Sequence, residues 1–595
     1  MWNFSVFSKP RQLIPVEQIL FLSPVLVLIC RMKFRPAELL NLYAIFLFLF
    51  LIFLSAVIFT GFWLGIDISS WTLVFAFMSY IVCIALYLFF KQSGNDKFLS
   101  LSLFAALTPL IFWGGIVCFN HTYDTSYDGP FYHETAIIAL ANKWDPIYKP
   151  SFPQTTPQVS SAVFDQGSPK IVWSIDASIY KLTNNLDSAT FINLMVSLIA
   201  LVFIYESLRT LGIKNRLSLL IALAAVFTPI FLDQIFSFRE DSLSYNFLLI
   251  GVASLVQINK SRHVLIYYAC LLSALILLAG SKFSNLYIFL SLIVLGAYLV
   301  WRHKLYLNRK IQLLSIGALI AGFIMIFNPI FTNTFDYHAI DYPYNQPVYA
   351  NSLRETGVPA NIRHDSRLEL FFYGIFSSSE ISNANNPASY AKLKIPFTFT
   401  GTELIADSQD ISKLVGGYGV LFSGISILSV IAYIYLIIES KSKPNKSIII
   451  WVHIAVVLIV VSCLLIPIPN YARYNSQLYL LPIVMIVALS LISSKDKVLS
   501  KLLSAMLLIS LVLNFYVDLI PSISIQEASF NLVNSQLSTL KNSHKTYQVY
   551  SEIFYPSYTE LRAHGININI VKKPLSCHNE LYLDFPPATQ LCPAG

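Results

Sequence analysis

Apolar stretches of about 20 residues recur along this 595-residue chain, from its first hundred residues to beyond position 500. A helix of about 20 apolar residues is long enough to cross the roughly 30 Å hydrocarbon core of a bilayer. Only 12% of the residues are charged, which is about half the share that is typical of a soluble domain. The chain is therefore predicted to be an all-α polytopic membrane protein with about 13–14 transmembrane helices.

The predicted spans are 38–60, 70–90, 98–118, 189–208, 217–233, 243–258, 263–280, 286–301, 311–331, 416–438, 448–467, 476–494 and 501–519. Residues 12–30 form a further apolar run that contains two prolines. This run is either one more span or a helix that lies in the membrane interface.

The basic residues predict which ends of the spans face the cytoplasm. Seven short connections between alternate spans hold 20 of the 40 Lys and Arg residues. Such enrichment in short loops is typical of the cytoplasmic side. The net charge of +8 is therefore a signal of topology and does not indicate a nucleic-acid partner.

The long polar segments fall on the opposite, outer face and carry 23 of the 32 acidic residues. The predicted organisation is N-terminal membrane helices (1–118), a first outer loop with amphipathic interfacial helices (119–188), membrane helices (189–331), a second outer loop (332–415), membrane helices (416–519) and a C-terminal tail (520–595). The tail alternates short apolar runs with turn residues, which predicts a small α/β appendage. Cys577 and Cys592 lie in this tail, where they form either a disulfide bond or two free thiols.

The first outer loop contains the segment TYDTSYDGPFYHETAIIALANKWDPIYKP. A short amphipathic helix is predicted from Gly129-Pro130 to Asp145-Pro146, lying along the membrane surface. Asp128 precedes this helix, and a carboxylate that a turn fixes close to the membrane suits a general base. The alternative is that Asp128 only caps the helix. Three following residues are candidates for substrate binding, namely Tyr132, His133 and Glu134.

A second acidic motif lies between two spans, in the segment FLDQIFSFREDSLSYN. Its carboxylates are Glu240 and Asp241, and Gln234 and Arg239 are candidates to bind substrate and donor phosphate. Ionisable residues at this depth are costly and are therefore functional candidates. The alternative is an ordinary solvated turn with an ion pair between Arg239 and Asp241.

Two more cations on the outer face are candidates to hold a phosphate group. Lys282 is the only cation in a five-residue turn, and its alternative role is to extend toward lipid headgroups. Arg473 lies at the outer mouth of a span, where it either clamps a phosphate or anchors the interface. Tyr474 beside it and His338 in the second outer loop are further candidates for substrate binding.

The sequence lacks the motifs that are typical of several other enzyme classes. The chain contains no HExxH, CxxC or DxDxDG motif, no Walker-type loop and no GxSxG. The remaining combination is a carboxylate base and several cations at the headgroup level of the outer face. This combination suits a sugar linked to a lipid phosphate, since the leaving phosphate needs cations and the acceptor hydroxyl needs a base.

The chain resembles the GT-C class of integral membrane glycosyltransferases, which includes the protein O-mannosyltransferases and the lipid A aminoarabinose transferases. The resemblance lies in the order and sidedness of YDGPFYHETAIIALANKWDPIY, SPKIVWSIDASIYKLTNN, SKFSN, NPIFTN and ARYNSQLYLLP, across roughly residues 120–480. It implies a polyprenyl-phosphate sugar as donor and a lipid, glycan or protein as acceptor, on the periplasmic face of a bacterial inner membrane.

The resemblance also assigns roles. It implies Asp128 as the catalytic carboxylate, with Asp124 as the second choice, and Glu240-Asp241 as the second acidic motif. Some members use a divalent metal ion, so a metal cofactor stays open. The predicted reaction is a single inverting step in which Asp128 deprotonates the acceptor while Arg473 and Lys282 steady the leaving phosphate.

One departure from the class and two alternatives accompany this prediction. Members usually carry the catalytic loop after the first span, whereas at least three spans precede it here. The first alternative is a polysaccharide polymerase or O-antigen ligase, which would use pyrophosphate-linked glycans and loop arginines. The second is a lipid-glycan flippase or transporter, which would need polar residues along a path through the spans.

Overall fold

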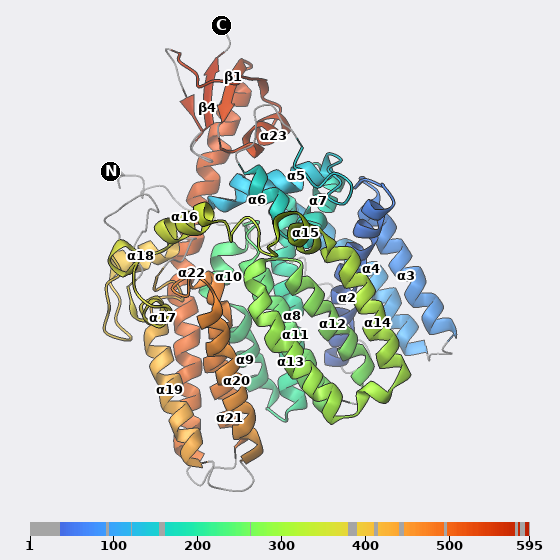
Figure 1. The fold of residues 1–595 in the computed structure, drawn as a ribbon, viewed down its shortest axis with the longest axis vertical. Helices are drawn as coiled ribbons and strands as arrows, with labels where there is room; N and C mark the ends of the chain where they lie inside the picture. Colours follow the sequence, from blue (N-terminus) through green and yellow to red (C-terminus); the bar gives the residue numbers. More distant parts are fainter. Residues whose placement is uncertain are drawn as a thin grey trace.

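The computed structural model describes residues 36–595 apart from 91–94, 121, 154–160, 262, 379–389, 410–414, 440–445, 493–496, 552, 578–580, 584–588 and 594–595. The predicted segment 12–30 lies outside the described residues. A body of long, roughly parallel helices carries a layer of shorter helices at one end, and a small domain stands above that layer (Figure 1).

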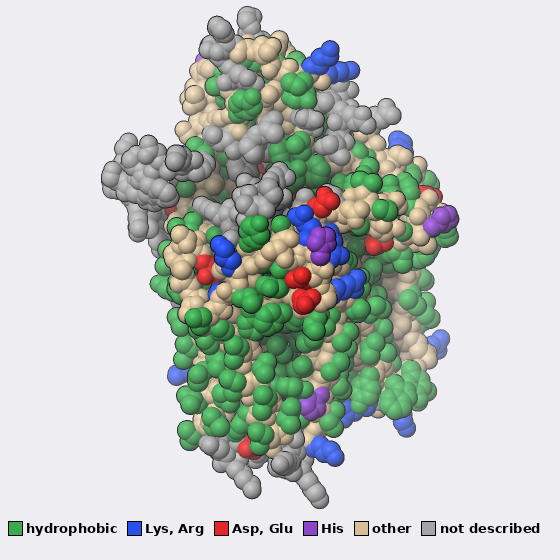
Figure 2. Space-filling view, turned by 60° about the vertical axis from the view of Figure 1, so that its left-hand side comes forward, with side chains coloured by type: hydrophobic (Ala, Val, Ile, Leu, Met, Phe, Trp, Pro, Cys, Tyr) green, Lys and Arg blue, Asp and Glu red, His purple; other side chains and the backbone are tan. Residues whose placement is uncertain are grey.

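The membrane body consists of fourteen described helices, three of which have twelve residues or fewer. They are α2 (Pro36–Trp63), α3 (Thr72–Phe90), α4 (Asn95–Phe119), α8 (Phe191–Thr210), α9 (Asn215–Val226), α10 (Pro229–Gln234), α11 (Asp241–Lys260), α12 (Val264–Ala279), α13 (Leu286–Arg302), α14 (Arg309–Ile326), α19 (Phe422–Glu439), α20 (Lys446–Leu465), α21 (Leu480–Leu491) and α22 (Lys497–Asn542). Hydrophobic side chains cover the outside of this body, and charged ones gather above it and at its lower edge (Figure 2).

Ten helical segments of the described chain are long and apolar enough to cross a membrane, and three shorter apolar helices lie where further spans were predicted. The protein is therefore a polytopic α-helical membrane protein. The predicted span 217–233 is divided into two pieces, because α9 ends at Val226 and α10 begins at Pro229. Proline has no N–H to continue the first helix, and the Thr228 hydroxyl instead caps the second by accepting a hydrogen bond from the Phe231 amide.

The last membrane helix corrects one predicted boundary. The chain was expected to leave the membrane at residue 519, yet α22 continues for 46 residues to Asn542. At 1.5 Å per residue the helix is about 70 Å long, roughly twice the thickness of the hydrocarbon core. The predicted division at 519/520 therefore lies inside a continuous helix that reaches from the membrane body into the C-terminal domain.

The C-terminal domain is the predicted small α/β unit. Its sheet has the strand order β2-β1-β4-β3, in which β1 (Thr546–Ser551) pairs in parallel with β2 (Asn567–Ile570) and antiparallel with β4 (Thr589–Pro593). Helix α23 (Pro556–Ala563) connects the two parallel strands, and β3 is Leu581–Tyr582. A disulfide bond joins Cys577 to Cys592 in β4.

The layer between the membrane body and this domain contains the two outer loops. The first loop forms η2 (Gly129–His133), α5 (Glu134–Ala141), α6 (Ala162–Gly167), α7 (Ile171–Thr183) and η3 (Asp187–Thr190). The second forms η6 (Phe327–Phe331), α15 (Thr332–Tyr337), α16 (Pro347–Gly357), η7 (Ala360–Ile362), α17 (Arg367–Phe376) and α18 (Gly401–Gln409). Short helical turns at η4 (Phe283–Asn285), η5 (Leu305–Leu307) and η9 (Arg473–Tyr479) complete the described helices.

One interfacial helix differs from its prediction. The helix after Asp128 was expected to lie along the lipid surface and to end at Asp145-Pro146. Instead, α5 ends at Ala141, and every residue in it except Ala139 is buried. It packs against α7 and α23. Protein therefore covers both its apolar and its polar face, and this places the segment that follows Asp128 in a rigid environment.

Candidate active site

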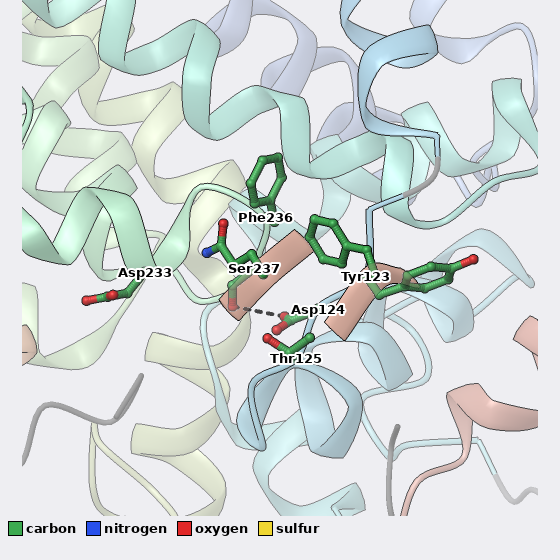
Figure 3. Close-up of a pocket in the computed structure, with 8 residues that line it drawn as sticks. Tyr123, Asp124, Thr125, Asp233, Phe236 and Ser237 are labelled. Carbon is green, nitrogen blue, oxygen red and sulfur yellow. Dashed lines mark hydrogen bonds between the residues drawn. The ribbon is translucent and has the colours of Figure 1, made fainter. Parts of the chain in front are cut away.

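Asp124 holds the loop that leads to Asp128. One carboxylate oxygen accepts a hydrogen bond from the Ser126 amide at 2.8 Å. The other accepts from the Ser237 hydroxyl at 2.9 Å and the Phe238 amide at 2.7 Å, and Figure 3 shows the Ser237 hydroxyl turned toward the carboxylate. Burial raises the pKa of Asp124 although these hydrogen bonds oppose the shift. The carboxylate therefore ties the first outer loop to the turn before α11.

The position of the Asp124 carboxylate also explains why residue 129 is a glycine. Gly129 donates its amide hydrogen to the Ser126 hydroxyl at 3.0 Å. A Cβ atom at this position would lie 1.9 Å from a carboxylate oxygen of Asp124, which is far closer than van der Waals contact. Only glycine leaves room for the turn that directs Asp128 away from Asp124.

Asp128 lies between two arginines. Its Oδ2 accepts hydrogen bonds from Arg473 at 2.8 Å and forms an ion pair with Arg239 at 3.1 Å. The Asp128 side chain is 21% exposed, whereas those of Arg239 and Arg473 are 2% and 8% exposed. Burial acts to raise the pKa of Asp128, but the charges of Arg239 and Arg473 outweigh it and hold the pKa well below its ordinary range. The side chain makes no capping hydrogen bond, so the capping alternative is wrong.

A second carboxylate lies on the other side of Arg473. Asp241 accepts a hydrogen bond from Lys282, and Arg473 Nη1 lies 4.0 Å from Asp241 Oδ2. Gln234 donates to Asp241 Oδ2 at 3.1 Å and accepts from the Ser242 amide at 2.8 Å, which fixes the start of α11. Lys282 is therefore paired with a carboxylate and does not extend toward lipid. The expected Arg239–Asp241 pair is replaced by Arg239–Asp128 and Lys282–Asp241.

Tyrosine rings cover these cations. The Lys282 amino group lies 4.2 Å from the centre of the Tyr474 ring, and the Arg473 guanidinium lies 4.9 Å from the same ring. Arg473 also lies 5.5 Å from the ring of Tyr471. Cation–π contacts of this kind keep the charged groups oriented when little water reaches them. The second predicted tyrosine, Tyr132, is close enough to Asp128 and Arg473 for their charges to act on its pKa.

Glu240 and Asp176 are both buried, and the charges of Asp176 and Lys282 act on Glu240. Glu240 is 3% exposed, and its Oε1 has no hydrogen-bond partner in the described part of the chain. Burial raises the pKa of Glu240 far above its ordinary value, Lys282 partly opposes this, and the charge of Asp176 adds to it. Burial also raises the pKa of Asp176, which lies in α7. Sequence reasoning missed Asp176, although a single carboxylate inside the apolar run KIVWSIDASIY was a usable signal.

Three predicted binding residues lie elsewhere or face another way. His133 is buried and accepts a hydrogen bond from the Trp173 indole at 2.8 Å, and burial lowers its pKa to about 3. It is therefore an uncharged packing residue behind Tyr132, whose ring centre is 4.1 Å from that of His133. Glu134 faces a cavity below the C-terminal domain. His338 is exposed at the end of α15, outside the group formed by Asp128 and its cations.

A divalent metal was left open by the sequence. Within the described ranges, no group of three or more His, Cys, Asp or Glu side chains is arranged to hold a metal ion. The charged groups around Asp128 are instead three cations and two carboxylates in direct contact. An anion such as a phosphate would compete with Asp128 and Asp241 for these cations, and a base released in this way would lie beside it.

Comparisons with known proteins add one likeness. No protein-family model matches the chain, and no curated protein matches it. Among solved structures, ArnT from Cupriavidus metallidurans in the apo state is similar over 81% of this chain and 87% of that one, with 12% sequence identity and a TM-score of 0.34. At this TM-score the likeness is too weak to support a conclusion about activity, so the functional conclusion depends on the chemistry of the site.

Proposed function

We propose that this protein is a membrane glycosyltransferase of the GT-C type. It moves a sugar from a polyprenyl-phosphate donor to a hydroxyl group of a lipid, glycan or protein acceptor on the outer face of a bacterial inner membrane. The supporting observation is the position of Asp128, a partly exposed carboxylate held by Arg239 and Arg473 at the outer end of the membrane body. The bound substrate would be membrane-embedded through its lipid tail, which brings its phosphate to this level.

The donor phosphate is bound by Arg473 and Lys282. Arginine can offer two parallel N–H groups to a phosphate, and lysine acts as a point charge. Both cations are now neutralised by carboxylates, because Arg473 contacts Asp128 and Lys282 contacts Asp241. The donor phosphodiester carries one negative charge, as each carboxylate does, and its two non-bridging oxygens let it share these cations with Asp128 and Asp241. The further negative charge that develops on the leaving phosphate then draws the two cations toward it.

This exchange resolves a difficulty with Asp128 as a base. A carboxylate with a strongly lowered pKa binds protons weakly, and its proton-accepting strength in the resting site is therefore poor. When the phosphate takes Arg473, the charge that lowers the pKa of Asp128 is partly removed. Asp128 is then a stronger base with the donor bound than in the resting site.

The transfer is a single displacement. The acceptor oxygen attacks the anomeric carbon of the sugar as its hydroxyl proton passes to Asp128. The bond between the anomeric carbon and the phosphate oxygen breaks, and its electron pair leaves with the lipid phosphate. Arg473 and Lys282 stabilise the charge that develops on this leaving group. Attack from the face opposite the phosphate inverts the configuration of the sugar.

The buried pair of Glu240 and Asp176 is assigned to the sugar. Burial raises the pKa of both groups and therefore favours their protonated form, which can donate a hydrogen bond. A protonated carboxyl beside an ionised one can both donate to and accept from sugar hydroxyls. Glu240 Oε1 has no hydrogen-bond partner among the described residues, and it can accept a hydrogen bond from a sugar hydroxyl.

Sugar transfer by the purified protein in detergent tests this proposal. Radiolabelled polyprenyl-monophosphate sugars and a membrane extract are supplied to wild type, Asp128→Asn and the control Asp336→Asn, which changes an exposed carboxylate of α15. Transfer by wild type and the control, with loss in Asp128→Asn, supports the proposal. Activity only with pyrophosphate-linked glycans would instead favour a polymerase or ligase, and flux of an unaltered lipid-linked glycan would favour a flippase.

A further inference from the structure

One residue of the first outer loop belongs to the core of another domain. The buried apolar cluster of the C-terminal domain consists of Val533, Leu537, Leu540, Tyr547, Val549, Tyr558, Leu561, Ile566, Leu583, Leu591 and Tyr123. Ten of these residues lie between positions 533 and 591. Among the described residues, Tyr123 is the only member from outside that interval, and it precedes Asp128 by five positions.

Tyr123 is held by both its ring and its hydroxyl. The side chain is 7% exposed, and its ring centre lies 6.2 Å from that of Phe530 and 6.3 Å from that of His564. The hydroxyl donates a hydrogen bond to Asn534 on α22 at 2.9 Å. A large aromatic side chain with a satisfied polar end is well suited to connect two units specifically.

The neighbouring residues show that the loop is fastened on two sides. Asp124 binds the turn at Ser237 and Phe238 in the membrane body, as described above. In Figure 3 its carboxylate points toward Ser237, while the Tyr123 ring extends away from that turn. Tyr127 contacts Phe554 of the C-terminal domain with ring centres 5.6 Å apart. Asp128 then turns back to Arg239 and Arg473.

The C-terminal domain has a rigid support for this contact. Helix α22 runs from the membrane body through Pro521 to Asn542, and Gln526 on it donates a hydrogen bond to the Leu232 carbonyl in α10 at 3.2 Å. Helix α23 of the same domain also packs against η2 and α5, which follow Asp128. The segment 123–141 is therefore contacted by the C-terminal domain both before and after the carboxylate.

We propose that Tyr123 is a positioning residue through which the C-terminal domain fixes the loop that carries Asp128. The domain is then part of the active site although it supplies no group that touches the reacting atoms. This inference rests on the proposed function, because it assigns Asp128 the role of base. Misplacement of a catalytic group by about 1 Å can lower a rate by about 100-fold, so loss of the contact is expected to act on the chemical step.

The test compares Tyr123→Ala with Tyr123→Phe and with Tyr582→Ala, which removes a half-exposed tyrosine ring from β3 of the same domain. We expect Tyr123→Ala to lower kcat by about 10–100-fold with little change in the KM for the polyprenyl-phosphate sugar. Tyr123→Phe keeps the ring and should retain most of the activity, and Tyr582→Ala should behave as wild type. An unchanged kcat in Tyr123→Ala, or an effect confined to the donor KM, would overturn the inference.

Hydrogen exchange supplies a readout that does not require activity. The peptide spanning residues 122–130 is expected to exchange faster in Tyr123→Ala than in wild type, while the spans keep their protection. Equal exchange would overturn the positioning role even if no sugar transfer is found. If Tyr123→Ala does not fold, Tyr123→Leu keeps part of the apolar volume but loses the ring contacts with Phe530 and His564, and a fall in kcat together with faster exchange of the same peptide is expected. Wild type that transfers from no donor would refute the proposed function alone.

Discussion

Two groups of carboxylates lie on opposite sides of the same short loop, and their surroundings differ completely. On one side, Asp128 contacts Arg239 and Arg473. On the other, a cavity below the C-terminal domain is lined by Asp124, Glu134, Asp187 and Glu560, with no Lys or Arg among the lining residues. Asp124, Asp128 and Glu134 lie within ten positions of one another, yet burial raises the pKa of Asp124 and Glu134 while two arginines lower the pKa of Asp128.

The difference shows what burial does with and without a counter-charge. Burial alone raises the pKa of Glu134 well above its ordinary value, and the carboxylates of Asp124 and Glu560 add to this effect. At Asp128 the two arginines reverse the same tendency. The cations therefore favour the charged form of Asp128, whereas burial among other carboxyl groups favours the neutral form of Glu134.

The largest effect is expected at Asp128. Asp128→Asn removes the proposed base while it preserves the shape of the side chain, so transfer should fall by about 10²–10⁴-fold. The protein should still fold, because an amide can occupy the same space between the two arginines. A sugar-transfer assay and a thermal melt, made on the same preparation, measure the activity and the stability of the variant. Transfer at the wild-type rate would remove Asp128 from the role of base and leave the two sides of the loop functionally alike.

A smaller effect is expected from the cation beside it. Arg473→Lys keeps the positive charge but loses the paired N–H groups that can hold Asp128 or a phosphate. We expect kcat/KM for the donor to fall by about 10–100-fold, mainly through KM. Arg367→Lys is the matched control, because Arg367 is exposed at the start of α17. Equal kcat/KM values in the two variants would contradict a phosphate-binding role for Arg473.

Asp124 should respond differently from Asp128 to the same substitution. Both oxygens of Asp124 accept backbone N–H groups, and an asparagine side chain offers only one accepting oxygen. Asp124→Asn therefore leaves a buried amide group facing a donor, which costs about 1–3 kcal/mol in the free energy of unfolding. A thermal melt should show this loss. An unchanged melt would show that Asp124 does not tie the loop to the turn before α11.

The smallest expected effect is on the pH dependence of thermal stability. Because the pKa of Glu134 is raised, its folded form holds a proton that the unfolded chain releases, so stability falls as the pH rises through the raised pKa. Glu134→Gln cannot lose that proton and should resist this fall. The difference in Tm between about pH 8 and about pH 5 is expected to be smaller in Glu134→Gln by about 2 °C or more. Parallel pH dependences of Tm would show that Glu134 is ionised in the folded protein.

Prediction from sequence succeeded where a property depends on neighbouring residues. The length of each apolar run predicts a span, and the described chain has apolar helices at these positions. The start of a helix after Asp128 followed from Gly129-Pro130, and the short α/β tail followed from alternating runs. Each of these features depends on the hydrophobicity or turn residues of one short segment, so it can be read from that segment alone.

The prediction was incomplete where residues far apart in the sequence meet. Nothing in the order of residues indicated that Tyr123 would enter a core built from residues 533–591, or that Asp176 would lie beside Glu240. Helix α22 also continues more than twenty residues beyond the predicted end of the last span, and its outer part packs into the C-terminal domain. Local propensity and hydropathy do not encode such contacts.

The sequence by itself determined that this is a membrane protein with acidic, chemically rich loops on one face, because hydrophobic transfer and loop charge act segment by segment. Only the tertiary structure decided which carboxylate meets which cation. Asp128 and Arg473 are separated by 345 positions in the chain. Helix packing brings them to 2.8 Å, while four residues earlier the loop turns Asp124 toward backbone amides. The charge state of each carboxylate follows from those partners, since burial favours the neutral form unless an opposite charge lies within contact distance.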